Sequence, residues 1–275
     1  MGKRRTRAPR RNATRRRPPL WIVNDEAAPT AGTEEAIPPP IGPVASSLLA
    51  EIAAAHDPLS AELVLCHVFR ATQTAMPGGP DDQDRSEMLT QLLGEVIDHA
   101  EALASADALA LLRVCSVLGP DSNRAAASDS ASRLAAAGVP DRPWASLVGH
   151  PRLLQAWRYG DIFQEQESVG ALFDYAGRDH AMMVLIDHSL GGGVKDGWVA
   201  AGRRARDMRN RVASEMATRS EAIFEDLGPA AMVDTLGAAL ARPPCPVQPD
   251  QVEDVAAYLD LIRSRVDHLR RLDIQ

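Results

Sequence analysis

The sequence predicts an α+β fold with a helical N-terminal part, a small antiparallel β-meander and C-terminal helices packing on it. Three observations support this prediction. Apolar residues from 44 to 138 recur at helical spacing, four short runs between 154 and 200 have strand character, and residues 250–272 carry a helical stripe. A disordered basic tail precedes the fold. The expected divisions are 1–43 (tail), 44–138 (helical part) and 139–275 (sheet with its helices), the last two forming one compact unit.

The tail is strongly basic and the remaining chain is acidic. Residues 1–17 contain nine basic residues and no acid. Removing these nine from the 30 Lys and Arg leaves 21 basic residues against 37 acidic ones, a net charge of −16. Residues 18–43 are rich in proline and cannot bury enough apolar surface to order themselves. A basic arm binds phosphate non-specifically, so the candidate nucleic-acid contacts are Arg4, Arg5, Arg7, Arg10, Arg11, Arg15, Arg16 and Arg17. A solubilising tail, self-association with the acidic body and a start codon assigned too far upstream are alternatives.

Five helices are expected in the helical part. Ser105 is a predicted N-cap, and the Gly119-Pro120 pair is a predicted stop signal. Asp121 or Ser122 is expected to cap the helix that follows. The expected helices span about 43–56, 59–74, 86–103, 105–118 and 121–138.

Four strands are expected next, at about 154–159, 168–175, 180–187 and 194–200. Short turns containing Gly or Asp join them, so an antiparallel meander is the simplest topology. The run 180–187 is apolar on both faces, which predicts that helices cover both sides of the sheet.

Three helices are expected after the strands, at about 203–227, 229–241 and 250–272. The last has apolar residues spaced by three and four. Such a stripe either packs on its own domain or forms the seam of a homodimer, and both alternatives are open. The stripe comprises Val252, Val255, Leu259, Ile262, Val266 and Leu269.

The most informative segment is 179–199, where an apolar strand meets three glycines. If residues 188–193 form a turn, the pairing brings Asp187 near Asp196, with His188 and Lys195 beside them. Two carboxylates, a lysine and a histidine are suited to acid–base chemistry or to a hard cation. Alternatively, these side chains satisfy turn amides and form an ion pair. The candidate anion-binding residues are Gly191, Gly192 and Gly193, although a strand rather than a helix follows them.

Other site types find little support in the sequence. Cys66, Cys115 and Cys245 are far apart and odd in number, which fits a reducing cytoplasm and disfavours a disulfide scaffold or structural zinc. No apolar run reaches the ~20 residues of a membrane span, so we expect no membrane partner. No Ser/His/Asp, Cys/His or HExxH pattern is found.

Gly138-Val139-Pro140, Trp157-Arg158-Tyr159, Asp187-His188 and the three glycines resemble a block of an uncharacterised actinobacterial protein family. The resemblance spans about residues 138–200. It implies an actinobacterial source and no activity, ligand or catalytic residue.

Three functions are compatible with the sequence. The leading hypothesis is a cytoplasmic, non-enzymatic interaction or regulatory protein, because no catalytic constellation is found and both the helical stripe and the charged tail suit a partner. The second is a small-molecule or metal-dependent enzyme with its site at the glycine turn. The third is a nucleic-acid-associated protein that uses the tail. The sequence identifies no cofactor.

Overall fold

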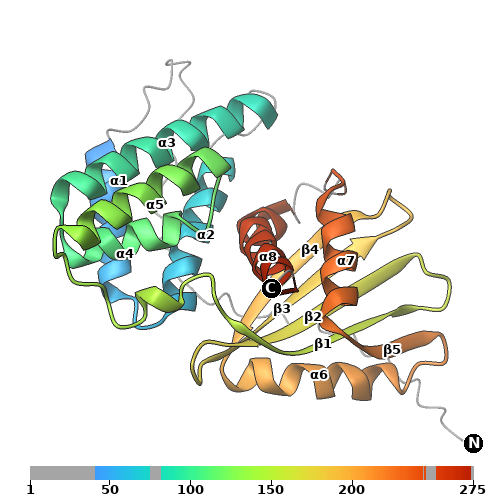
Figure 1. The fold of residues 1–275 in the computed structure, drawn as a ribbon. Coiled ribbons are helices and arrows are strands. Elements are labelled where there is room, and N and C mark those ends of the chain that lie inside the picture. Colours follow the sequence, from blue (N-terminus) through green and yellow to red (C-terminus); the bar gives the residue numbers. More distant parts are fainter. Residues whose placement is uncertain (1–40, 75–81, 244, 246–251, 274–275) are drawn as a thin grey trace, which may run out of the picture. The chain divides into compact units, whose positions relative to one another are not determined.

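The computed structural model describes residues 41–74, 82–243, 245 and 252–273 (Figure 1). The described residues have the predicted α+β fold. The predicted disordered tail spans residues 1–43, and its residues 1–40 lie outside the described part of the chain. Residues 41–43 already belong to the first helix, where Pro43 is tolerated because the first helical turn needs no amide donor.

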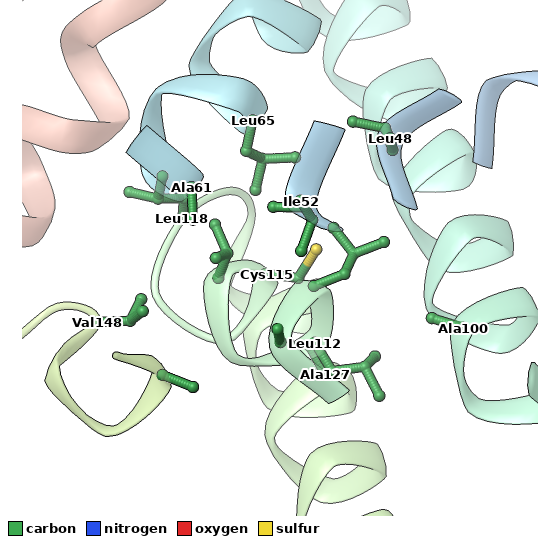
Figure 2. Packing of buried hydrophobic residues seen from close by; sticks show 14 of the residues in the cluster. Leu48, Ile52, Ala61, Leu65, Ala100, Leu112, Cys115, Leu118, Ala127 and Val148 are labelled. Atoms are coloured by element: carbon green, nitrogen blue, oxygen red, sulfur yellow. The ribbon is translucent and has the colours of Figure 1, made fainter. Parts of the chain in front are cut away.

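The helical part contains the five predicted helices. The predicted cap of the fifth is wrong, because that helix begins at Asp121 itself, with Pro120 at the N-cap and no side-chain cap hydrogen bond. Seven of the ten residues of α4 are buried, which places this helix at the centre of its neighbours. Ser105 is its N-cap as predicted, with the side chain accepting a hydrogen bond from the amide of Ala108. Figure 2 shows the aliphatic core, to which α1, α2, α4 and α5 contribute Leu48, Leu65, Leu112 and Ala127. The helices are α1 (Ile41–Ala54), α2 (Pro58–Thr74), α3 (Asp82–Leu103), α4 (Ala106–Cys115) and α5 (Asp121–Ala136).

The predicted antiparallel meander is confirmed. Its four strands follow one another in the sheet as they do in the chain, and each pairs antiparallel with the next. A short 3-10 helix, η1 (Ala145–Leu147), precedes them. The strands are β1 (Arg152–Asp161), β2 (Gln166–Asp174), β3 (Asp179–Asp187) and β4 (Gly193–Ala201).

The helix predicted over 203–227 is wrong beyond residue 216. The helix α6 (Arg203–Met216) ends there, and β5 (Ala222–Leu227) pairs antiparallel with β1 at the edge of the sheet. The order of strands is therefore β4-β3-β2-β1-β5. Met216 and Ile223 are spaced so that both could lie on one face of a helix, but β1 has an unpaired edge there and Ile223 pairs with it. That long-range pairing outweighs local periodicity.

Helices cover both faces of the sheet, as the two-sided apolar run of β3 predicts (Figure 1). On one face Val184 and Ile186 pack in a cluster with residues of α7 (Pro229–Leu240) and α8 (Val252–Asp273). On the other face Trp157 and Met183 pack with Ala205 of α6.

The described part of the α8 stripe packs within the chain. Ile262, Val266 and Leu269 are buried in the cluster with the sheet and α7, and Leu259 is half-buried against it. A homodimer would therefore need another surface than these four side chains.

A buried ion pair links the helical part to α8 and the sheet. Glu62 of α2 and Arg265 of α8 are 0 % and 1 % exposed, and the guanidinium donates to both carboxylate oxygens at 3.1 and 2.5 Å. The hydroxyl of Tyr175, just after β2, also donates to Glu62 at 2.7 Å, and the amide of Gly149 does so at 3.1 Å. These three partners give the Glu62 carboxylate four hydrogen bonds, as a buried charge requires because it is costly unless it is well hydrogen-bonded.

Candidate functional site

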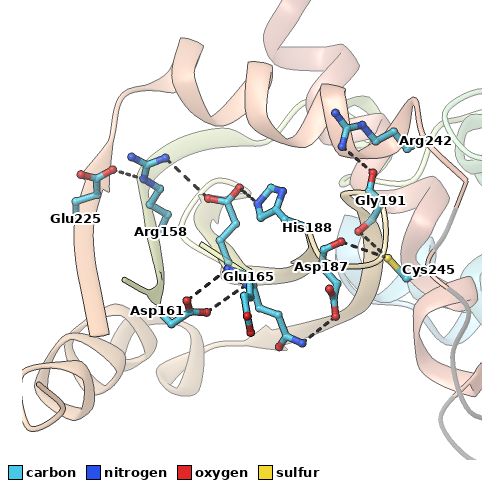
Figure 3. A network of polar contacts seen from close by, with 12 residues as sticks. Arg158, Asp161, Glu165, Asp187, His188, Gly191, Glu225, Arg242 and Cys245 are labelled. Atoms are coloured by element: carbon cyan, nitrogen blue, oxygen red, sulfur yellow. Dashed lines mark hydrogen bonds and ion pairs between the residues drawn. The ribbon is translucent and has the colours of Figure 1, made fainter. Parts of the chain in front are cut away.

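The glycine turn is built around Asp187, the last residue of β3, which is only 1 % exposed (Figure 3). One carboxylate oxygen accepts hydrogen bonds from Lys195 at 2.6 Å and Gln166 at 2.8 Å. The other accepts from the Ser189 hydroxyl at 2.5 Å and the Leu190 amide at 3.2 Å. The carboxylate is thus surrounded by donors of its own chain.

These donors lower the pKa of Asp187 to about 2, with the hydrogen bond from Lys195 as the largest cause and that from Ser189 as the next. A carboxylate held in this way is a weak proton acceptor near neutral pH. Its chemistry is that of a structural anchor for the turn.

The side chain of His188, the first residue of the turn, contacts other residues than the Asp187 carboxylate does. Its Nε2 lies 2.9 Å from Oε1 of Glu167, and the Arg158 guanidinium lies 3.8 Å from the other Glu167 oxygen (Figure 3). Arg158 also contacts Glu225 of β5. The predicted group of four is therefore not brought together in one set of contacts.

A β-bulge in the β3–β4 ladder lies at Lys195, just before Asp196. Leu185 pairs with Asp196 and Ile186 with Val194, so Lys195 is the extra residue. The bulge allows Lys195 to reach Asp187. Asp196 accepts a hydrogen bond from the amide of Gly197 at 2.7 Å.

The three glycines are fixed by contacts inside the chain. Gly191 and Gly192 have positive φ, and their amides donate to the carbonyls of His188 and Asp187. The carbonyl of Gly191 accepts from Arg242 at 2.7 Å (Figure 3). A Cβ on Gly193 would lie 2.1 Å from the carbonyl oxygen of Pro243. Two of the three candidate anion donors are thus already used within the turn.

A second turn lies against the glycine turn at the same end of the sheet. It joins β1 to β2, and its Glu165 carbonyl accepts a hydrogen bond from the His188 amide at 2.8 Å. Asp161 orders it by accepting hydrogen bonds from the amides of Phe163 and Gln166 at 2.8 and 3.2 Å. We define the turn end of the sheet as residues 161–166, 188–193 and 221–223, the last being the start of β5.

The turn end carries most of the exposed large apolar side chains in the described part of the chain. Ile162, Phe163, Leu190 and Ile223 are 50 %, 65 %, 48 % and 40 % exposed. The other three, Leu103, Leu154 and Leu272, lie elsewhere. The sequence interpretation missed this cluster. An available signal was the apolar pair Ile162-Phe163 inside a turn, where polar residues are the rule.

Two cavities lie at the turn end. One of about 440 Å³ is lined by Arg158, Gly160, Glu167, His188 and Ile223, among others, and the register of β1 puts these residues on the face covered by α7 and α8. The other, of about 580 Å³, adjoins the end of α6 and is lined by Tyr159, Ser168, Leu185, Met216 and Ala222, among others. Glu167 and Arg158 were not candidates from the sequence, because only the strand register brings them to His188.

Three further expectations concern the tail arginines, a metal site and membrane-spanning helices. The tail arginines Arg4 to Arg17 lie outside the described residues. Among the residues that are described, no three or more His, Cys, Asp or Glu side chains are grouped so as to hold a metal ion. No helix of that same part is long and apolar enough to cross a membrane.

Comparisons with protein-family models, curated proteins and solved structures find no match for this chain. The resemblance to an actinobacterial family stays a prediction.

Proposed function

We propose that this protein is a cytoplasmic, non-enzymatic interaction protein and that the turn end of its sheet binds the partner. One observation carries the proposal: Ile162, Phe163, Leu190 and Ile223, four of the seven exposed large apolar side chains in the described chain, are gathered there. Single exposed apolar residues are ordinary, whereas a cluster is typical of a binding surface.

The order of the supporting backbone adds to this argument. Asp161 holds the turn that presents Ile162 and Phe163, and Glu165 ties that turn to the glycine turn that presents Leu190. Apolar anchors on a pre-organised scaffold lose little conformational entropy on binding. Aromatic residues are enriched among those that dominate interface energies, and Phe163 is the exposed aromatic side chain of this group.

The small-molecule enzyme is the second candidate, and one contact favours it. His188 faces the 440 Å³ cavity with its Nε2 against Glu167, an arrangement that fixes the tautomer of a histidine base. The saturated hydrogen bonding of Asp187 argues against this carboxylate as the catalytic group. Nucleic-acid association through the tail stays a hypothesis.

The test compares partners recovered by quantitative mass spectrometry with the tagged protein from cells that express it naturally. The wild type is compared with Ile162→Ser/Phe163→Ser and with the control Leu103→Ser, which removes an equally exposed apolar side chain elsewhere. Exposed substitutions of this kind change stability by about 0.5 kcal/mol or less. We expect a partner that the double variant loses and the control keeps. Equal recovery with all three proteins would contradict the proposal.

A further inference from the structure

The two edges of the sheet differ in whether another described segment hydrogen-bonds to them. At the β4 edge the chain that follows α7 returns, and the amide of Cys245 donates to the carbonyl of Val194 at 3.0 Å. At the other edge β5 is the last strand, and no described strand pairs beyond it. The β5 edge borders the turn end through Ile223.

The direction of the free hydrogen-bonding groups follows from the ladder. The amide of Ile162 donates to the carbonyl of Glu221 at 3.0 Å, and hydrogen-bonded pairs alternate along antiparallel strands. Ile223 and Glu225 therefore direct their backbone groups toward β1. Phe224 and Asp226 direct theirs outward, away from the sheet.

The described β5 edge has no Lys, Pro or bulge to block strand addition. Natural edge strands use these features, short length or other charged side chains to avoid pairing. The six-residue β5, Ala-Ile-Phe-Glu-Asp-Leu, has Glu225 and Asp226 as its charges, and its register with β1 runs without a shift. These two carboxylates disfavour an acidic strand and leave a basic one able to pair. An extended peptide can pair with such an edge.

The charge of this region selects the kind of segment that can pair. Six acidic side chains lie on β5 and on the segments beside it: Asp161, Glu165, Glu167, Glu221, Glu225 and Asp226. Arg158 pairs with Glu167 and Glu225, and Arg209 pairs with Asp226. Asp161, Glu165 and Glu221 form no ion pair with another described residue, so they give this end of the edge its negative charge. A second copy of β5 would bring its own Glu225 and Asp226 against these carboxylates. Like charges across strands are destabilising, so a basic segment is favoured over a second copy.

We infer that the partner adds an extended segment along β5 as a sixth strand, with Lys or Arg alternating with apolar residues. The inference rests on the proposed function and names the partner's chemistry. One basic side chain of the segment passes Ile223 and reaches the 440 Å³ cavity, whose carboxylates are Asp161 and Glu167, the latter shared with Arg158 and His188. The outward amides and carbonyls of Phe224 and Asp226 pair with its backbone.

The first test uses the wild-type protein and a short blocked peptide in which Val alternates with Lys. The control peptide has Glu in place of Lys. We expect the Lys peptide to bind at least about tenfold more tightly and amide exchange to slow at Phe224 and Asp226 more than at Ile223 and Glu225. Equal binding of the two peptides, no binding, or protection elsewhere would overturn the inference.

The second test uses a matched pair of variants. Asp226→Pro removes an outward amide, which an edge strand tolerates, and Asp226→Asn keeps the amide while removing the same ion pair with Arg209. We expect the proline variant to bind the Lys peptide about fivefold more weakly than the asparagine variant, as for one lost hydrogen bond. Equal affinities of two folded variants would contradict strand addition. If the proline variant does not fold, the exchange pattern of the wild type decides.

The two proposals fail in different ways. If the peptide does not bind while Ile162→Ser/Phe163→Ser still loses a cellular partner, strand addition is wrong and the interaction function stands. If the double variant loses no partner either, both are wrong.

Discussion

His180 is a neutral histidine built into the core. Its ring stacks between Phe173 and Tyr175, with centroids 5.4 and 5.1 Å away, and its Nε2 lies 3.4 Å from the Arg265 guanidinium. Burial, and then the charge of Arg265, lower the pKa of His180 from 6.5 to about 2. The folded protein therefore excludes a proton that the unfolded chain binds readily.

This predicts a pH-dependent stability. Because the folded pKa is depressed, the stabilisation is complete above pH 6.5 and is lost as the pH falls from 6.5 toward 2. Well below pH 6.5 the loss is about 1.4 kcal/mol per pH unit for one proton. In urea unfolding at several pH values, His180→Asn should have a flatter slope than the wild type. Parallel slopes would show that His180 is not the linked group.

The low pKa of Asp187 gives a prediction about a single contact, the one with Lys195. Lys195 is the largest cause of its low pKa, so Lys195→Met should raise that pKa from about 2 toward 3.8. Arg242→Met is the control, because Arg242 donates to the Gly191 carbonyl at the same turn and is not among the groups that lower the pKa of Asp187. The carboxyl carbon of Asp187, followed by NMR during an acid titration, measures the shift. An unchanged midpoint in Lys195→Met would remove the lysine from the account.

At the scale of elements, local patterns identified most of the fold. Five helices, four strands and the cap at Ser105 carry spacing or turn signals within a few residues of themselves. The fifth strand does not, because Ile223 and Phe224 become strand residues only through the edge of β1. Asp187 and Lys195 flank one turn, so the sequence could suggest their pairing. Glu167 and His188 come together only through the register of two strands, which the sequence does not predict.

The close packing of β1 on β2 gives a prediction at this scale. A Cβ on Gly170 would lie 2.2 Å from Cε2 of Trp157, whose indole is fully buried and cannot move aside. Gly170→Ala should therefore destabilise the protein by about 1–3 kcal/mol. Gly42→Ala, in the first turn of α1 with open space around its Cβ position, should not destabilise the protein. Thermal unfolding of the two variants compares them, and a neutral Gly170→Ala would contradict this packing.

At the scale of the whole molecule, Glu62 and Arg265 join parts that are 203 positions apart in the chain. No local sequence pattern predicts an ion pair between residues so far apart in the chain. Its partners come from α2, α8, the loop before β1 and the end of β2, so the helical part and the sheet share one polar centre. We expect the two parts to unfold together.

Arg265→Met tests whether the Glu62–Arg265 pair stabilises the association of the two parts. It leaves Glu62 buried without its cation and should cost about 3–5 kcal/mol of unfolding free energy. Arg113→Met breaks the exposed pair with Asp141 and should cost about 1 kcal/mol or less. Urea unfolding followed by far-ultraviolet circular dichroism measures both. Similar small losses would mean that the buried pair does not hold the two parts together.

The central claim is that the turn end binds a partner, and a photo-cross-linking scan tests it most directly. A photoreactive phenylalanine analogue replaces each exposed large apolar residue in turn, in cells that express the protein naturally. We predict one discrete adduct from Ile162, Phe163, Leu190 and Ile223, and none from Leu103, Leu154 and Leu272. Adducts spread evenly over all seven positions, or no adduct from the first four, would contradict the claim.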